Sequence, residues 1–265
     1  MSAEDAPVAR VDAVLDDAGI GTITINQPAR RNAMTYPMMG ELFTHLRTLG
    51  AEPACRVVIL TGAGDTFCAG TDLVHLESIP AAERGFRGEL HDPDGWWNIV
   101  ACPKPVICAV DGAAVGMGAE WSSMADVRIA TTRARFAWNF GHRGLVPDTG
   151  AGTWLLPRQI GLQAALQLLY SGRWLDADEA LALGYVARVV APEDLGDAVR
   201  REAQSYLASG PEALARTKQL AYAALGAPVG EHQRRSRDAL LACFTSDEHA
   251  EGVRAFRERR DPRFG

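Results

Sequence analysis

Residues 56–73 read RVVILTGAGDTFCAGTDL, and residues 105–120 read PVICAVDGAAVGMGAE. Each stretch begins with a short run that is almost wholly apolar, over 56–60 and 105–110, and each run leads into a turn rich in glycine. Strands that are apolar on both faces belong to sheets with a layer of helices on each side. The two stretches therefore predict an α/β fold in which strand, glycine turn and helix follow one another.

The flanking segments extend this pattern. Alternating apolar residues over 11–26, interrupted by a turn at 16–19, predict a β-hairpin. Apolar residues at helical spacing predict a helix over 37–50, with Pro37 in its first turn. We expect a further helix over 112–125, followed by a strand over 126–130.

From about Thr153 onward the pattern is helical. The predicted helices cover residues 154–170, 176–183, 192–208, 211–224, 230–244 and 247–259. No stretch resembles a disordered linker. We therefore divide the chain into a core over 1–195 and a helical region over 196–265, which are expected to pack together as one domain.

Composition excludes several classes of protein. The 265 residues include 27 basic and 33 acidic side chains, a net charge of −6, and 47% of residues are apolar. This balance argues against disorder and against nucleic acid as a partner, because binding to a phosphate backbone depends largely on Lys and Arg.

The cysteines and the N-terminus indicate a cytoplasmic protein. Five cysteines without a C-x-x-C pair predict neither a disulfide framework nor a metal site. The first residues are acidic and lack the basic flank and apolar run of a secretory signal. No run approaches the roughly 18 apolar residues of a membrane span, so no membrane partner is expected.

The two glycine turns, over 62–73 and 111–120, are candidates for a binding site. Small residues allow the backbone to approach a ligand, and the start of a helix presents free N–H groups with partial positive charge. Two such turns side by side could hold one oxyanion. For either turn alone, close packing of helix on strand is the favoured explanation. The polar segment 83–97 is either a surface excursion or the wall of a binding pocket.

Several motifs occur in one order along the chain. They are Gln27-Pro28 with RNAM at 31–34, FCAGTDL at 67–73, GAAVGMGAE at 112–120, GLVPD at 144–148, ALALGYV at 180–186 and EGVRAF at 251–256. Together, over residues 10–262, they resemble the crotonase superfamily of enoyl-CoA hydratases and isomerases. The resemblance implies a spiral of ββα turns with a helical C-terminal region, assembled as homotrimers or hexamers.

The same resemblance implies the chemistry. The substrate would be an acyl-CoA thioester, with coenzyme A as part of the substrate, no separate cofactor and no metal. Its carbonyl oxygen would accept hydrogen bonds from the backbone N–H groups of Thr71 and Met117, which stabilise an enolate. The family often has glycine at the position of Met117.

Proton transfer would fall to Glu120 and Asp148. Glu120 corresponds to one of the two glutamates of the hydratases, and Phe140 stands where the second would fall. Asp148 corresponds to an aspartate that isomerases use to move protons. Between Pro147 and residues 154–158 this chain is one residue longer than similar sequences, so alignment from downstream places Thr149 at that position; we prefer Asp148. Without the resemblance, Asp148 reads as a helix N-cap and Glu120 as a buried structural acid.

The resemblance also places the rest of the substrate. The coenzyme A site it implies comprises Arg30, Arg31, Asn32, Ala33, Ala69, Gly70 and Asp72. The acyl pocket it implies comprises Trp97, Trp138 and Phe140, although core packing is an alternative for Trp138.

We therefore predict an enoyl-CoA hydratase/isomerase, with isomerisation favoured because Phe140 replaces a glutamate. Three alternatives remain open. These are hydration by Glu120 and Asp148, an acyl-CoA binding protein without turnover, and a hydrolase or dehalogenase with Asp148 as nucleophile.

Overall fold

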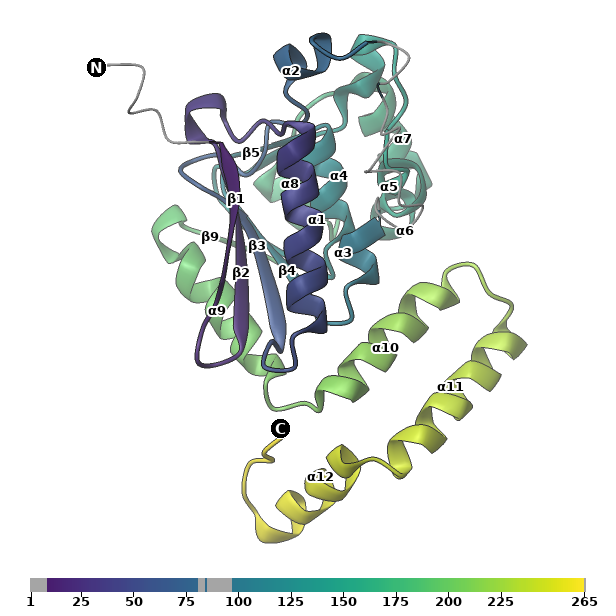
Figure 1. Cartoon of the computed structure of the whole chain (residues 1–265). Helices are drawn as coiled ribbons and strands as arrows, with labels where there is room; N and C mark the ends of the chain where they lie inside the picture. Colours follow the sequence, from purple (N-terminus) through teal and green to yellow (C-terminus); the bar gives the residue numbers. More distant parts are fainter. Residues whose placement is uncertain (1–8, 81–83, 85–96, 265) are drawn as a thin grey trace.

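The computed structural model describes residues 9–80, 84 and 97–264 (Figure 1). Of the pocket wall predicted over 83–97, only Arg84 and Trp97 lie within the described residues. The described chain is a mixed α/β structure with helices at its C-terminal end, as the sequence predicts.

A six-stranded sheet forms the centre of the molecule. In spatial order its strands are β1 (Arg10–Leu15), β2 (Ile20–Asn26), β3 (Val57–Gly62), β4 (Val106–Val110), β6 (Val127–Thr131) and β9 (Arg188–Val190). The predicted hairpin is confirmed, because β1 and β2 pair antiparallel. The other neighbours pair parallel, and Leu60 of β3 lies opposite both Ile23 and Cys108.

Helices cover both faces of this sheet (Figure 1). Helix α1 (Tyr36–Ala51) begins at Thr35, whose hydroxyl accepts a hydrogen bond from the Met38 amide, and it buries its apolar side on one face. Helix α9 (Leu195–Tyr206) packs on the other face. Because both faces are covered, all five residues of β4 are buried, which explains the uninterrupted apolar run.

A second, three-stranded sheet lies beside the first and consists of β5 (Ala113–Val115), β7 (Arg135–Ala137) and β8 (Leu175–Asp176). The helix expected over 112–125 is wrong in its first half, because β5 precedes helix α4 (Met117–Met124). Gly112 and Gly116 have φ of +62° and +53°, so neither can continue a helix. Glycine turns thus set the beginning of α4 at Met117.

The long helix predicted over 154–170 is also wrong, because the chain forms three short helices there. These are α5 (Ala151–Trp154), α6 (Leu156–Ile160) and α7 (Leu162–Ser171). Pro157 lies in the first turn of α6, where the missing N–H is tolerated, and Gly161 has a φ of +84°, which ends that helix. Strands β8 and β9 likewise interrupt the region predicted as entirely helical.

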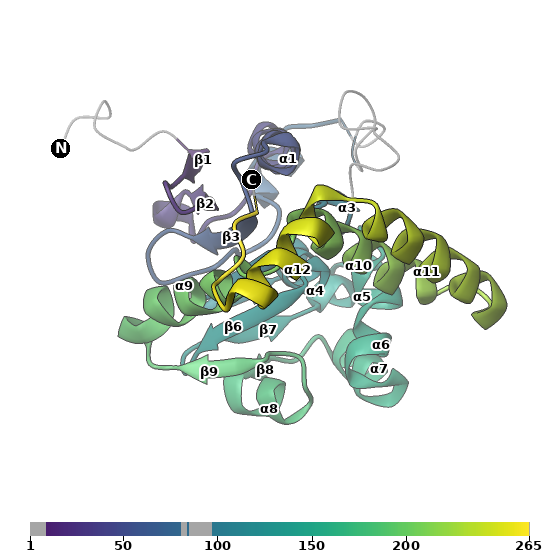
Figure 2. The same ribbon diagram turned by 90° about the horizontal axis from the view of Figure 1, so that it is seen from below.

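The remaining C-terminal helices agree with prediction. They are α8 (Ala177–Ala182), α10 (Pro211–Ala224), α11 (Val229–Phe244) and α12 (Asp247–Glu258). Helices α10 to α12 extend away from the sheet, whereas α9 lies against it (Figures 1 and 2). The predicted boundary after residue 195 falls at the beginning of α9.

Helix α10 is tied to the core by Lys218 and by Tyr222, whose hydroxyl bonds to the Met124 carbonyl and the Asp126 carboxylate. The Lys218 ammonium lies 2.8 Å from a carboxylate oxygen of Asp126 and donates to the carbonyls of Ile99 and Lys104, each at 3.1 Å. Its side chain is almost fully buried, and three acceptors match its three N–H donors. These contacts hold the first tail helix against the body of the molecule.

Candidate active site

The two predicted glycine turns lie back to back. Cys68 and Ala114 pair as a parallel β-bridge. A Cβ built on Gly118 would stand 2.4 Å from the Cys68 carbonyl oxygen, and one built on Gly70, with φ of +93°, would stand 2.7 Å from the Val115 oxygen. Only glycine permits this approach, so close packing of the two turns explains both glycines.

The free backbone N–H groups at this junction include those of Thr71 and Met117. Met34 bonds to Gly70 and Asp72, on either side of Thr71, and leaves the Thr71 amide unpaired. Met117 is the first residue of α4, so its amide has no intrahelical acceptor and carries part of the positive end of the helix dipole. Neither amide has an acceptor among the described residues. Both were predicted as oxyanion donors.

Glu120 lies one turn after Met117 on α4, and residues three apart share a helix face. Its side chain is fully buried, and its Oε2 accepts a hydrogen bond from the Thr149 hydroxyl at 2.5 Å. Its Oε1 has no hydrogen-bond partner among the described residues. Burial raises the pKa of Glu120 to about 7. The hydrogen bond from Thr149 and the nearby backbone amides of Gly152 and Ala151 oppose this rise, and the charge of Asp148 adds to it.

Asp148 lies at the more accessible side of this carboxyl. Its surface reaches solvent, yet the protein around it displaces enough water to raise the pKa of its carboxyl to about 6. The alternative that Asp148 caps a helix is wrong. Gly150 is the N-cap residue of α5, and the Ala151 amide bonds instead to the Thr149 hydroxyl at 3.2 Å.

The structure thus brings Thr149, and not Asp148, into direct contact with Glu120. Thr149 is the residue that the alternative alignment places at the catalytic position. Two carboxyl groups with pKa values raised into the neutral range, within electrostatic reach of each other, can exchange protons near neutral pH.

The predicted acyl-pocket residues lie at different depths. Phe140 is buried, and its ring tip lies 3.8 Å from a Cβ built on Gly116, next to the beginning of α4. Trp138 is fully buried with its edge against Tyr185, which matches the core alternative. Trp97 is half-buried and packs edge-on against Trp154, with ring centroids 5.6 Å apart.

Most of the predicted coenzyme A residues line one groove. This groove has a volume of about 380 Å³ and is lined by Ala29, Arg30, Arg31, Ala33, Ala69, Thr71, Asp72, Leu73 and Val74. It therefore contains the predicted oxyanion donor Thr71 as well. Arg30 is half-exposed and lies 3.1 Å from the buried Asp72, whose other oxygen accepts from the first amides of α2 (Leu73–Glu77).

Asn32 and Gly70 do not line this groove. The Asn32 side chain is fully buried and bonds to the Gln27 amide and to the carbonyls of Ala63 and Thr66. It holds the loops after β2 and β3 together, so its side chain is not available to a ligand. Gly70 lets the two glycine turns approach closely, because a Cβ there would stand 2.7 Å from the Val115 oxygen.

Sequence reasoning missed Gly152, which lies beside Glu120. A Cβ built on Gly152 would stand 2.3 Å from Oε1 of Glu120 and 3.0 Å from the Trp138 ring. The signal was present as the second glycine of the small-residue run 150–152, but only the structure reveals what it faces.

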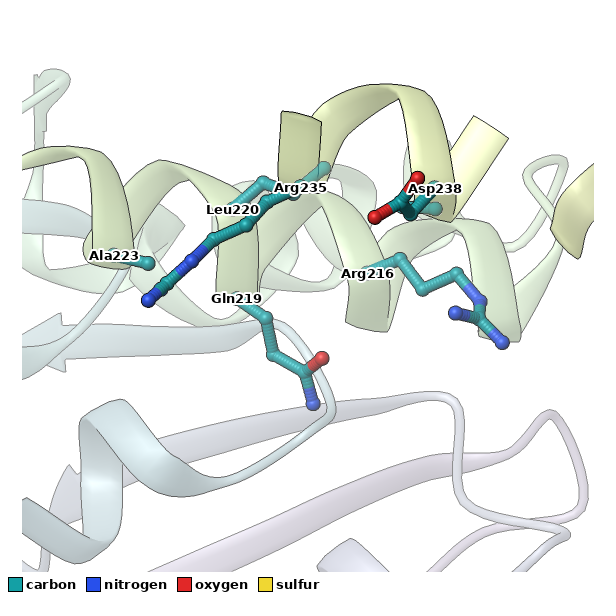
Figure 3. Close-up of a pocket in the computed structure, with 7 residues that line it drawn as sticks. Arg216, Gln219, Leu220, Ala223, Arg235 and Asp238 are labelled. Carbon is teal, nitrogen blue, oxygen red and sulfur yellow. The ribbon is translucent and has the colours of Figure 1, made fainter. Parts of the chain in front are cut away.

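A second hollow lies between α10 and α11, and its lining side chains come from both helices (Figure 3). Its arginines, Arg216 and Arg235, pair with Glu212 and Glu231 on their own helices. None of the predicted site residues lines it. Within residues 9–80, 84 and 97–264 no group of metal-ligating side chains comes together, and no helix there is long and apolar enough to span a bilayer.

Comparisons with known proteins agree with this geometry. The family described as enoyl-CoA hydratase/isomerase matches residues 16–265. A 1,2-epoxyphenylacetyl-CoA isomerase from Escherichia coli is 35% identical, with 94% of this chain and 95% of the relative covered. A crotonyl-CoA hydratase from Syntrophomonas wolfei is 34% identical, with coverage of 92% and 94%.

Solved structures extend the similarity to the fold. An enoyl-CoA hydratase subunit from Geobacillus kaustophilus superposes with a TM-score of 0.88 at 31% identity, covering 98% of this chain and 99% of its own. An enoyl-CoA hydratase from Bacillus anthracis gives a TM-score of 0.88 at 28% identity, with coverage of 96% and 98%.

Proposed function

The chain belongs to the enoyl-CoA hydratase/isomerase family, and on that premise we propose that it isomerises the double bond of an enoyl-CoA thioester. It is an enzyme of the hydratase/isomerase type. The observation that carries the choice of reaction is the buried Phe140, which stands where hydratases have a second glutamate. It leaves Glu120, a buried carboxyl with an unpartnered oxygen, as the group that moves the proton.

A shift of a double bond needs one group that removes a proton from carbon and returns it to another carbon. Glu120 in its ionised form takes the proton, and the negative charge moves to the thioester oxygen. The amides of Thr71 and Met117 stabilise that oxygen, at about 3 to 4 kcal/mol for each donor. Glu120 then returns the proton to the other carbon, with no atom gained or lost. If Asp148 supplies that proton instead, Glu120 passes its own proton to Asp148, so that both carboxyl groups are restored.

The groove lined by Arg30 and Thr71 binds the coenzyme A part of the substrate in this proposal. Arg30 and Arg31 supply positive charge at its rim, and the backbone of Ala33 and Ala69 forms its wall. A negatively charged protein thus binds a polyanionic substrate through a few arginines and backbone groups. In this proposal Asp72 orients Arg30, since the two side chains form an ion pair.

Hydration is the second candidate, and the 34% identity to a crotonyl-CoA hydratase supports it. Hydration uses two acids or bases on one water, and Phe140 stands where the second glutamate of the family falls. The buried apolar ring of Phe140 favours isomerisation, because it excludes water from that side.

We also propose that copies of the chain associate through the tail. Helices α10 and α11 have no residue that is buried as a whole, and five large apolar side chains of α11 and α12 are more than half exposed. These are Val229, Leu240, Leu241, Phe244 and Phe256. Association as a trimer or hexamer would cover them. Sedimentation of the purified protein tests this, and a monomer at micromolar concentration would contradict it.

The test of the reaction uses two probes on the purified enzyme. We expect conversion of a 3-enoyl-CoA to the 2-enoyl-CoA to be faster than hydration of crotonyl-CoA. Fast hydration that survives Asp148→Asn would contradict the isomerase proposal and support the second candidate. A covalent acyl adduct on Asp148, found by intact mass, would instead support a hydrolase.

A further inference from the structure

We infer that Thr149 is a positioning residue for Glu120, whose hydroxyl holds Oε2 and leaves Oε1 as the oxygen that exchanges a proton with the substrate. The inference rests on the proposed function, since it takes Glu120 to be the group that moves the proton.

The Thr149 hydroxyl is fixed by two contacts. Thr149 is buried, and its Oγ1 accepts a hydrogen bond from the Ala151 amide at 3.2 Å. A hydroxyl has one hydrogen, and the amide already occupies one lone-pair direction. The hydrogen is therefore directed at Oε2 of Glu120, 2.5 Å away. Because Ala151 begins α5, the helix itself sets the direction of the donor.

The second carboxylate oxygen faces a different environment. Oε1 is buried without a hydrogen-bond partner in the described part of the chain, and it occupies the space that a side chain at position 152 would fill. The backbone amides of Gly152 and Ala151 lie near enough to the carboxyl to lower its pKa. Of the elements packed against α4, β5, α5 and α3 (Asn98–Ala101) carry no charged side chain. Arg128 of β6 donates to the carbonyls of Ser122 and Ser123, in the second half of α4. Asp148 is the charged group that acts on Glu120. The two oxygens are thus chemically distinct.

This distinction affects catalysis in two ways. A carboxylate held by one oxygen loses rotational freedom, so the free oxygen has a defined direction toward the substrate. The hydrogen bond also stabilises the ionised form and opposes the effect of burial on the Glu120 carboxyl. Thr149 thereby acts on proton transfer without contacting the substrate.

The extra residue between Pro147 and α5 affects how Asp148 and Thr149 are placed around Glu120. Asp148 and Thr149 are adjacent candidates for one catalytic position, and the structure gives them different environments. Thr149 turns inward to Glu120, while Asp148 stays at the accessible side. The longer connection allows both residues to act on the same carboxyl.

The test compares Thr149→Val, which keeps the side-chain shape without the hydroxyl, with Thr149→Ser, which keeps the hydroxyl. In Thr149→Val we expect kcat for 3-enoyl-CoA isomerisation to fall about tenfold, with little change in KM. The acid limb of its pH profile should move upward by about one pH unit, because a hydrogen bond to the ionised carboxyl is lost. Thr149→Ser should return the midpoint to the wild-type value.

A second readout does not depend on turnover. The infrared band of protonated carboxyl groups, followed against pH and assigned to Glu120 by its loss in Glu120→Gln, reports the same midpoint directly. Thr149→Ala provides a second variant without the hydroxyl in case Thr149→Val is unstable. Thr153→Val, an exposed threonine of α5 whose hydroxyl contacts the Gly150 carbonyl, is the matched control and should change neither midpoint.

Two results would overturn the inference. One is an unchanged infrared midpoint in both hydroxyl-free variants, and the other is a Thr149→Ser variant that behaves like Thr149→Val. If the wild type turns over neither 3-enoyl-CoA nor crotonyl-CoA, the proposed function fails, whereas the infrared midpoints still decide whether Thr149 controls Glu120.

Discussion

Gly152 lies against the carboxylate of Glu120 so closely that a Cβ on Gly152 would stand 2.3 Å from Oε1. The two residues come from different helices, α5 and α4, and their contact leaves Oε1 free of any side chain from α5. The proposed catalytic carboxyl therefore depends on the absence of a methyl group.

Gly152→Ala should impair activity without unfolding the protein. The added Cβ must push Oε1 away by about 1 Å to reach a normal contact distance, and a displacement of that size costs about 100-fold in rate. Alanine is favourable within a helix, but its Cβ would also stand 3.0 Å from the buried Trp138 ring, so we expect a folded protein that is less stable by about 1 to 3 kcal/mol. Gly196→Ala in α9, where a Cβ meets nothing within 4 Å, is the control. Wild-type kcat in Gly152→Ala would contradict the placement of Oε1.

Met117→Pro should remove one oxyanion donor while keeping the helix. Proline is tolerated at the first position of a helix, which Met117 occupies, and it lacks the backbone N–H. We expect kcat to fall about 100- to 1000-fold, the usual loss for one oxyanion-hole donor. Met117→Leu keeps the N–H and a similar volume, so its activity should stay within a few fold of wild type. Equal activities of the two variants would show that this amide does not stabilise the enolate.

Asn32→Asp should destabilise the protein. The Asn32 amide group donates to the buried carbonyls of Ala63 and Thr66, at 2.9 and 2.6 Å, and aspartate would present an acceptor to both. We expect a loss of about 2 to 4 kcal/mol in unfolding free energy, measured by urea denaturation. Arg47→Ala on the exposed side of α1 is the control. Unchanged stability together with weakened coenzyme A binding would mean that Asn32 contacts the ligand after all.

Glu120 should make the protein less stable as pH rises. Its folded pKa of about 7 exceeds the unfolded value of 4.5, so between these values the folded state binds more protons than the unfolded state. Its stabilising effect is complete below pH 4.5 and is lost as pH rises toward 7, at a cost of about 3 kcal/mol. Comparing the unfolding free energies of wild type and Glu120→Gln from pH 4.5 to 8 checks this. A difference that stays constant with pH would contradict the raised pKa.

Much of the fold can be predicted from the sequence, because helix starts and apolar spacing depend on residues that lie close together in the chain. Helix α10 extends over the predicted residues 211–224, since Pro211 opens it and apolar spacing continues through it. Strands β7 and β8, of three and two residues, are too short to show an alternating pattern. The series α5 to α7 reads as one helix until the φ of Gly161 is known.

The candidate site was also predictable in part, because its motifs are short stretches of sequence. Motif spacing locates Glu120 and the free amides, but it cannot tell which of Asp148 and Thr149 turns inward, because that depends on where α5 begins. Asn32 belongs to the RNAM motif over 31–34, but its side chain bonds to the loops after β2 and β3. Only the three-dimensional contacts reveal this.

The central claim, that Glu120 removes a substrate proton while two backbone amides stabilise the enolate, is tested most directly by isotope exchange. A 3-enoyl-CoA incubated in D2O with the enzyme should acquire deuterium as its double bond moves, because the proton on the buried Glu120 exchanges with solvent through the exposed Asp148 before it is returned. Mass spectrometry of the thioester detects this. Glu120→Gln should reduce the rate at least 100-fold, the usual contribution of a general acid or base, with substrate binding retained. Exchange at the wild-type rate in Glu120→Gln would contradict the account.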